Sequence, residues 1–182
     1  ISFKTKERMR MSETDILKFA GNDNKPAESN ALNVKAQKWQ ELLVKKNITC
    51  FGAQIVGDEL HTVLFRTILD VNGQNLPLLV YTDDSLYTVI KVLVAPAARK
   101  AENEAALLKY LDEQNRKYKL FKYSTGVSGD VELDCCLLNT DDGFDAELLQ
   151  VSIDVILEHL LEEYPLLMKV VWGAEAVDTT TN

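Results

Sequence analysis

The sequence predicts one α+β domain, with a single antiparallel sheet and helices packed on it. Its 182 residues suffice for one domain of ordinary size. Runs of alternating apolar residues, separated by turn residues, indicate a meander of three or four strands and a later hairpin. Helical patterns stand before, between and after these strands. The predicted order is therefore helix, three or four strands, helix, two strands, helix.

The N-terminal part, residues 1–33, is expected to be a flexible arm. Ser12, with Asp15 three positions later, can cap a short helix through Ile16, Leu17 and Phe19. Turn-forming residues follow at 21–26. Met11 is followed by Ser-Glu-Thr, which is typical of a protein start, so we also hypothesise that residues 1–10 are an over-extended reading of the gene.

The first helix of the domain is predicted from residue 34 to about Asn47. Asn33 is a suitable N-cap residue. Apolar residues then recur at three- and four-residue spacing, which places them on one helix face: Ala36, Trp39, Leu42 and Leu43.

The meander follows in four segments. Residues 49–55 alternate, and a longer strand then carries one face of His61, Val63, Phe65, Thr67, Leu69 and Val71, with Leu64, Arg66 and Ile68 on the other. Asn72-Gly73 is the strongest hairpin signal, because a type I′ turn needs positive φ at both central residues. The third strand, 76–82, contains Pro77, which predicts an edge or strand-start position. The fourth covers 86–94.

The second half of the chain adds a helix over 99–117, a hairpin and a final helix. The second strand of that hairpin alternates cleanly, with Val131, Leu133, Cys135 and Leu137 pointing inward. Asp145 is predicted to cap the last helix, which runs to about Glu163, and Pro165 is expected to kink or restart the chain.

The last helix also carries a second apolar strip. Leu148, Val151 and Val155 fall together at 100° per residue, roughly opposite the main buried stripe. Two explanations remain open. The arm or a loop covers this strip, or it is an interface with a second copy or with a partner.

The net charge limits the classes of partner that we expect, and the cysteine content limits the compartment. A formal charge of −8 argues against nucleic acid and against a membrane surface. The basic run at 4–10 sits in the arm with little aromatic content. No apolar stretch approaches the roughly 20 residues that a membrane span requires. Three cysteines without framework spacing suit a reducing compartment, so we expect a cytoplasmic protein.

The sequence predicts no catalytic, cofactor-binding or metal-binding site. Cys135 and Cys136 are neighbours on a strand and point to opposite faces, so they cannot jointly hold a metal in the Cys-x-x-Cys manner. His61 and His159 have no second ligand at a suitable spacing. The acidic residues at 83–84 and 141–145 fit turns and a helix start better than a calcium loop. We therefore expect a protein that is not an enzyme.

Several segments resemble the YbjN family of putative bacterial sensory transduction regulators, whose fold is similar to that of class I type III secretion chaperones. The segments are 108–118, 121–123, 129–133, 145–149 and 163–168. The resemblance implies a small acidic domain that forms a homodimer, with no enzymatic activity and no catalytic residues to transfer. It covers about 100–172 and is topological over 34–96; the possible fourth strand before the middle helix departs from the secretion chaperones.

These observations predict an arm at 1–33, one domain at 34–172 and a disordered tail at 173–182. The expected function is that of a chaperone-like or regulatory adaptor that binds an extended or helical protein segment. A dedicated secretion chaperone and a small-molecule sensor are the alternatives. Fold alone does not decide among them.

Overall fold

The computed structural model describes residues 32–173 and shows three helices and six strands in that part of the chain. In chain order these are α3 (Val34–Lys45), β1 (Gly52–Ile55), β2 (Val63–Val71), β3 (Gln74–Thr82), β4 (Tyr87–Ala95), α4 (Glu104–Lys117), β5 (Lys122–Thr125), β6 (Val131–Leu138) and α5 (Ala146–Trp172). The predicted order, with four strands before α4, is confirmed.

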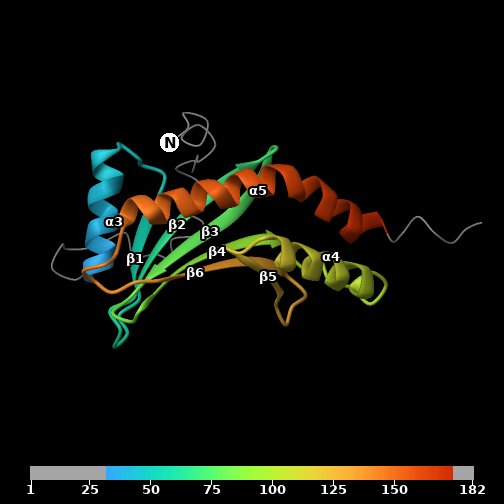
Figure 1. Ribbon diagram of the computed structural model, residues 1–182, viewed down its shortest axis with the longest axis horizontal. Helices are drawn as coiled ribbons and strands as arrows, with labels where there is room; N and C mark the ends of the chain where they lie inside the picture. Colours follow the sequence, from blue (N-terminus) through green and yellow to red (C-terminus); the bar gives the residue numbers. More distant parts are fainter. Residues whose placement is uncertain (1–31, 174–182) are drawn as a thin grey trace, which may run out of the picture.

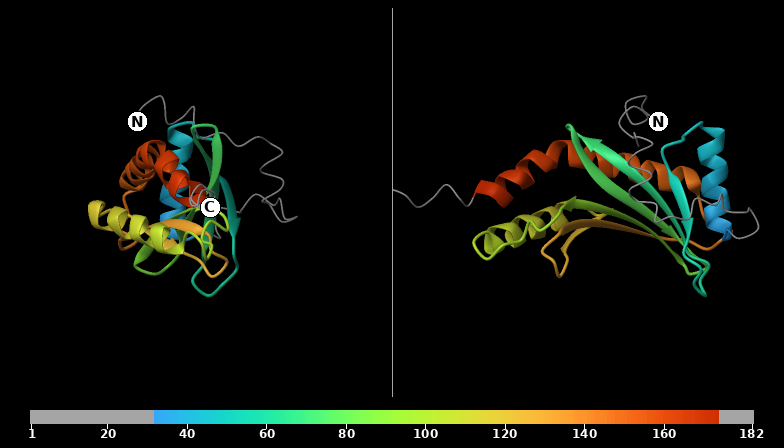
Figure 2. Two further views of the ribbon diagram at one scale, coloured as in Figure 1. Left: turned by 90° about the vertical axis from the view of Figure 1, so that its right-hand side faces the viewer. Right: turned by 180° about the vertical axis from the view of Figure 1, so that it is seen from behind.

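All strands form one antiparallel sheet in the order β1-β2-β3-β4-β6-β5. The three helices lie on one side of this sheet, with the long α5 running across the strands and α3 at one end (Figure 1; Figure 2). The α+β class is therefore confirmed. One face of the sheet packs on helices, and the described helices leave the opposite face bare.

The core lies between the sheet and the helices. Inward side chains at every second position of β2, β3, β4 and β6 are buried, among them Phe65, Leu78, Ile90 and Leu133. They meet the apolar stripe of α5, including Leu149, Ile153 and Leu160. The inward alternation predicted for β6 is confirmed, because Val131, Leu133 and Cys135 are buried and Leu137 is partly so.

Pro77 lies inside β3, a central strand that begins at Gln74, so both the edge and the strand-start position predicted from it are wrong. The two-residue turn at Asn72 and Gly73 makes Val71 and Gln74 a hydrogen-bonded pair, and the alternation then makes Ile68 and Pro77 a non-hydrogen-bonded pair. The nitrogen of Pro77 therefore faces β4. The ladder with β4 stops at Leu78, so no strand bond requires the missing N–H.

Helix α3 is fixed at its start by Asn33 and Lys35. The Asn33 side chain accepts a hydrogen bond from the Ala36 N–H at 2.8 Å, which confirms the predicted cap. Its amide donates to the carbonyl of Thr82 at 2.9 Å, at the end of β3. Lys35 is fully buried and donates to the carbonyl oxygens of Ser85 and Tyr87, which ties the β3–β4 turn to the helix.

Helix α5 is continuous from Ala146 to Trp172, with Pro165 inside it. Its start is as predicted, since the carboxylate of Asp145 accepts bonds from the N–H groups of Glu147 and Leu148. The predicted end near Glu163 is wrong. Apolar residues beyond the proline, Leu167 and Val171, continue the buried stripe, and this packing outweighs the local disruption by Pro165.

At both ends, the predicted domain boundaries fall close to the limits of the described residues. Leu32 and Asn33, assigned above to the arm, are buried, and Gly173 ends the described chain. The short helix predicted from Ser12 and the hypothesis on residues 1–10 lie outside the described residues.

Helix α4 begins at Glu104 rather than at residue 99, after a turn held by the Asn103 side chain. Between residues 32 and 173, no helix has both the length and the apolar character for crossing a membrane.

Candidate functional site

The bare face of the sheet, opposite the helices, carries an apolar surface that we call the open face. It consists of the outward side chains of β2, β3, β4 and β6. An antiparallel sheet with one solvated face normally alternates apolar and polar residues along each strand. Here many outward positions of the central strands are apolar as well: Leu64, Ile68, Pro77, Leu79, Tyr81, Val89 and Leu93.

The open face is hollowed near its centre. A cavity of about 400 Å³ is lined largely by apolar side chains of three central strands, with charged residues at its margin. The lining comprises Arg66, Thr67, Ile68, Pro77, Leu78, Leu79, Tyr81, Lys91, Leu93, Asp130 and Glu132. This volume lies within the range typical of sites for small molecules or for one or two anchoring side chains of a partner.

The strand register sets the charges beside this hollow. Arg66, Leu79, Lys91 and Asp134 form one row across four strands. Lys91 contacts Glu132 at 2.6 Å and Asp134 at 3.0 Å. Burial acts to lower the pKa of Lys91, but its hydrogen bonds and charge interactions with these two carboxylates outweigh burial and raise the pKa. Cations and carboxylates thus flank an apolar floor, an arrangement suited to orienting a segment that also carries charge.

The apolar strip predicted on the last helix is exposed to solvent. The exposed fractions are 56% for Leu148, 50% for Val151 and 40% for Val155. They lie in the first half of α5 on the side away from the sheet, as the helical pattern predicts. Coverage of this strip by a loop within the described residues is excluded by these values. Asp154 beside it is half buried, and burial raises the pKa of its carboxyl group.

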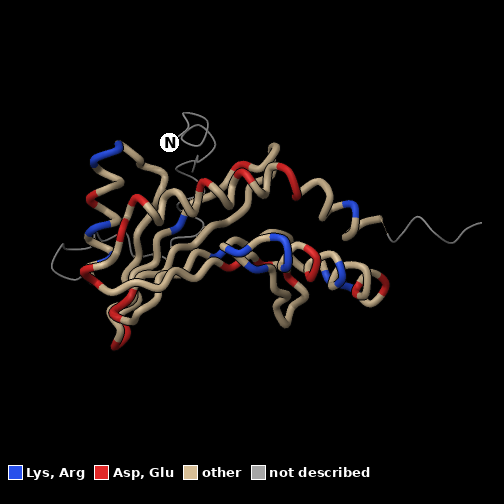
Figure 3. Tube along the Cα trace, in the orientation of Figure 1, with Lys and Arg blue, Asp and Glu red and all other residues tan. Residues whose placement is uncertain are grey.

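Acidic side chains accompany this strip. Glu158 and Glu162 follow it on the exposed side of α5, and acidic residues recur along most of the helix (Figure 3). Glu147 at its start is paired with Lys46 from the end of α3. The strip therefore offers a small apolar contact next to negative charge.

His159 is the centre of a buried aromatic and polar cluster that the sequence did not predict. It shares a hydrogen bond of 2.8 Å between its Nε2 and the Tyr123 hydroxyl, and its ring lies 4.3 Å from that of Tyr118 and 4.5 Å from that of Phe121. Burial lowers the pKa of His159 to about 4, so the imidazole is neutral at pH 7. The cluster joins α4, β5 and α5.

Glu163 extends the cluster towards α4. It accepts a hydrogen bond from the Tyr110 hydroxyl at 2.7 Å and one from Lys117 at 3.2 Å. Burial alone would raise the pKa of Glu163, but these two donors outweigh it and lower the pKa. The hydrogen bonds satisfy buried polar groups between two helices, and we read them as structural.

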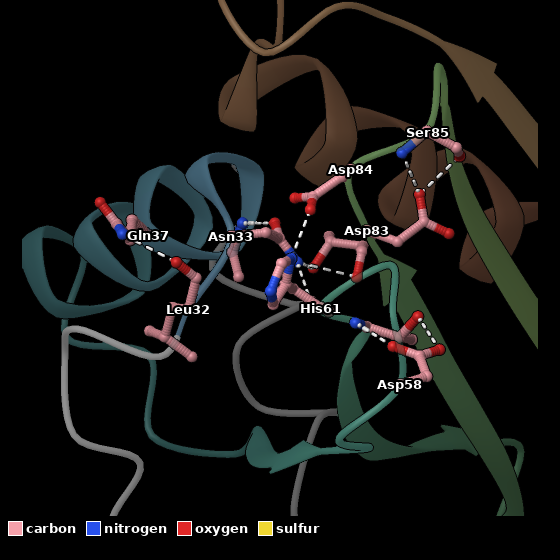
Figure 4. A network of polar contacts seen from close by, with 11 residues as sticks. Leu32, Asn33, Gln37, Asp58, His61, Asp83, Asp84 and Ser85 are labelled. Carbon is pink, nitrogen blue, oxygen red and sulfur yellow. Dashed lines mark hydrogen bonds and ion pairs between the residues drawn. The ribbon is translucent and has the colours of Figure 1, made fainter.

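His61 lies in a turn and not on the strand face predicted for it. Its φ of 51° is incompatible with a strand, and β2 begins only at Val63. The Nδ1 atom lies 2.5 Å from a carboxylate oxygen of Asp84, and this hydrogen bond, followed by the charge of Asp84, raises the pKa of the imidazole. Figure 4 shows this pair next to Asn33, where the turn joins the start of α3.

The two neighbouring cysteines point to opposite faces, as predicted. Cys135 is fully buried in the core, whereas Cys136 is exposed on the open face in the row of Tyr81 and Val89. Burial, followed by the neighbouring Cys136, raises the pKa of Cys135 to about 11. Among the described residues, no three His, Cys, Asp or Glu side chains converge in a way that could hold a metal ion.

The acidic residues predicted at turns form hydrogen bonds in the turns and at the start of a helix. Asp83 accepts hydrogen bonds from the N–H and hydroxyl of Ser85, and Asp145 caps α5. Asp141 and Asp142 offer their carbonyl oxygens to Lys38 of α3. The carboxylates of Asp83 and Asp145 thus stabilise a turn and a helix start, whereas Asp141 and Asp142 make these contacts through the backbone alone.

The hollow of the open face was not predicted from the sequence. A signal existed, because the apolar Leu64 and Ile68 already stand on the outward side of β2 in the sequence pattern. Their convergence with β3 and β4 requires the strand register.

Comparison with known proteins gives no family. No protein-family model matches the chain, and no curated protein matches it. The resemblance to the YbjN family therefore stays a prediction.

Proposed function

We propose that this protein is a non-enzymatic protein-interaction module that binds a segment of a partner protein on its open face. The observation that carries the proposal is the apolar hollow of about 400 Å³ on a sheet face that the described helices leave uncovered. The apolar side chains around this hollow are half-buried or buried, and an uncovered apolar surface rimmed by charge is typical of interaction sites.

Docking onto the face is favoured over addition of a strand to the sheet edge. The edge strands are β1 and β5, each of four residues, and short edge strands offer few backbone groups to a partner. Lys122 and its ladder partner Asp134 add charge at the β5 edge. The hollow lies instead over β2, β3 and β4, where Leu79 and Leu93 can receive apolar anchors of a helical or extended segment.

The proposed role is that of a chaperone-like or regulatory adaptor in the cytoplasm. The resemblance to the YbjN family implies such a regulator without enzymatic activity. The three cysteines among the described residues form no disulfide, which supports a reducing compartment.

We also propose a homodimer that uses the strip of Leu148, Val151 and Val155 on α5. Its exposure supports an interface, and the family resemblance implies a dimer. The open face remains accessible in such a dimer because α5 lies on the other side of the sheet.

The proposal is tested by affinity capture from the native host with matched variants. Leu79→Asp places a carboxylate between Arg66 and Lys91 in the strand row, so the charge is compensated while the apolar floor is lost. The matched control is Val127→Asp in the fully exposed β5–β6 loop. We expect a dominant partner to be retained by the wild type and the control and lost by Leu79→Asp. Equal retention by all three would contradict the open face as the binding surface.

A small-molecule sensor is the second candidate, favoured by the volume of the same hollow. A ligand that binds only the native state raises the melting temperature. Screening metabolites by thermal shift therefore separates the two functions. A compound that stabilises the wild type and not Leu79→Asp would support the sensor over the adaptor.

A further inference from the structure

We propose that the partner segment on the open face is basic and amphipathic. Its apolar side chains lie over Leu79 and Leu93, and lysine or arginine side chains on one flank contact the carboxylates of β6. The inference rests on the proposed function in taking the open face as the partner site. It adds the chemical class of the partner, which the apolar hollow alone does not define.

The acidic margin of the hollow lies along β6. Asp130 precedes this strand, and Glu132 and Asp134 follow at every second position, so the three side chains share the open face. Neighbours in this series are about 7 Å apart along the strand. The side chains of Glu132 and Asp134 are 28% and 34% exposed. A cation of a partner can therefore reach them.

These carboxylates outnumber the cation beside them. Lys91 on the neighbouring β4 contacts Glu132 at 2.6 Å and Asp134 at 3.0 Å, so one positive charge is shared by two negative charges. Lys122, the ladder partner of Asp134, directs its ammonium group to two carbonyl oxygens at the end of α4 instead. This side of the hollow therefore keeps a net negative charge.

Asp130 adds a third negative charge in a fixed position. Its carboxylate accepts hydrogen bonds from the hydroxyl of Ser128 and from the N–H of Ala97, and these bonds lower its pKa. Asp130 is therefore ionised at pH 7. Because these donors are neutral, they leave its charge available to a partner.

The two sides of the hollow differ in charge, which sets the orientation of the segment. Arg66, Leu79, Lys91 and Asp134 form one row, and neighbouring strands are about 4.8 Å apart. Arg66 thus stands on one side of the Leu79 floor and the β6 carboxylates on the other. An acidic flank over β6 would have to compete with both carboxylates for Lys91. We therefore place the partner's cations over β6 and not over β2.

A helix has suitable dimensions for both contacts. An α-helix with its side chains is about 10–12 Å across. When its apolar stripe lies over Leu79 and Leu93, one polar flank lies over β6, two strands away from Leu79. The formal charge of −8 on the whole chain also attracts a basic segment from a distance.

The test measures binding of two synthetic peptides to the full chain by fluorescence anisotropy. Both are about 14 residues long, or about 21 Å as a helix, and carry the same leucine stripe. One has lysine and the other glutamate along one flank. We expect the lysine peptide to bind about tenfold more tightly or better, as expected for charge pairs at a partly desolvated surface. Raised salt should reduce this difference.

Three variants locate the charge effect. Glu132→Gln leaves the pair of Lys91 and Asp134 in place and should weaken the lysine peptide by about threefold or more. Lys91→Met releases both carboxylates and should strengthen it, which a merely damaged fold would not do. Glu113→Gln removes a carboxylate from the exposed side of α4 and should change nothing. Melting temperatures of all variants check that the fold is intact.

Equal affinities of the two peptides, or no binding of the lysine peptide, overturn the inference. So do weaker binding to Lys91→Met and capture of a second copy of this chain at position 79. Capture from the native host separates the two proposals. A native partner that is lost with Leu79→Asp but retained equally by Glu132→Gln and Lys91→Met sustains the adaptor and contradicts a basic segment. The predicted peptide order without any partner dependent on Leu79 does the reverse.

Discussion

The side-chain amide of Asn72 donates a hydrogen bond of 3.0 Å to the carbonyl oxygen of Leu161. In an α-helix this oxygen would accept from the N–H of residue 165, but that residue is Pro165, which has none. The β2–β3 hairpin turn thus supplies the bond that the proline removes. Figure 1 shows the tip of this hairpin beside α5. This contact helps explain why the helix continues to Trp172.

Asn72 and Pro165 should therefore be energetically coupled. Asn72→Gly keeps the positive φ of the turn and removes the donor, so we expect it to lower the free energy of unfolding by about 1 kcal/mol. In a Pro165→Ala background the helix satisfies Leu161 itself, and the same substitution should have a smaller effect. Urea unfolding of the four proteins in a double-mutant cycle measures the coupling. Strict additivity would show that the hydrogen bond does not compensate for the proline.

His159 should make stability depend on pH. Its folded pKa of about 4 lies below the ordinary 6.5, so the unfolded chain binds the proton first as the pH falls. Stability is thus present above pH 6.5 and lost towards pH 4, by about 2 kcal/mol between pH 7 and pH 5. Urea unfolding of His159→Gln should show a smaller loss over this interval.

His61→Gln is the control for this pH effect. Its pKa is raised by the hydrogen bond to Asp84, so its protonation favours the folded state and has the opposite sign. Removing it should not reduce the loss of stability between pH 7 and pH 5. If His61→Gln and not His159→Gln flattened the profile, the assignment to the buried cluster would be wrong.

The three thiols should react in a defined order. Cys136 is exposed, whereas burial raises the pKa of both Cys50 and Cys135. Titration with a chromogenic disulfide at pH 8 should therefore show one fast thiol, and Cys136→Ser should abolish that phase. Fast reaction of Cys135 in the native protein would contradict the register that places it in the core.

The α5 strip should govern the oligomeric state. Val155→Glu places a charge in the centre of the exposed strip and should shift the protein from dimer to monomer in sedimentation equilibrium. Leu108→Glu, on the exposed side of α4, is the matched control and should leave the mass unchanged. An unchanged mass and melting temperature of Val155→Glu would exclude the strip as an interface.

Much of this fold could be predicted because its signals are local. Asn72-Gly73 dictates the hairpin, the alternation over 131–137 dictates β6, and Asp145 caps α5. The failures have tertiary causes. Pro77 is tolerated centrally because the β3–β4 ladder stops at Leu78, and α5 continues past Pro165 through packing and Asn72.

The candidate sites also differ in whether local sequence patterns predict them. The strip on α5 followed from helical periodicity alone and is exposed as that pattern requires. The hollow of the open face needs the register of three strands, and the cluster around His159 needs the docking of β5 against two helices. Neither of these tertiary arrangements can be predicted from the spacing of residues along the chain.

Photo-cross-linking from position 79 in the native host tests the central proposal most directly. A photoreactive amino acid replaces Leu79 at the floor of the hollow, and a second protein carries it at Val127 in the exposed β5–β6 loop. We expect irradiation to join position 79, and not position 127, to one partner protein that mass spectrometry can identify. Adducts with other proteins from position 127 and none from position 79 would contradict the open face as the partner-binding surface.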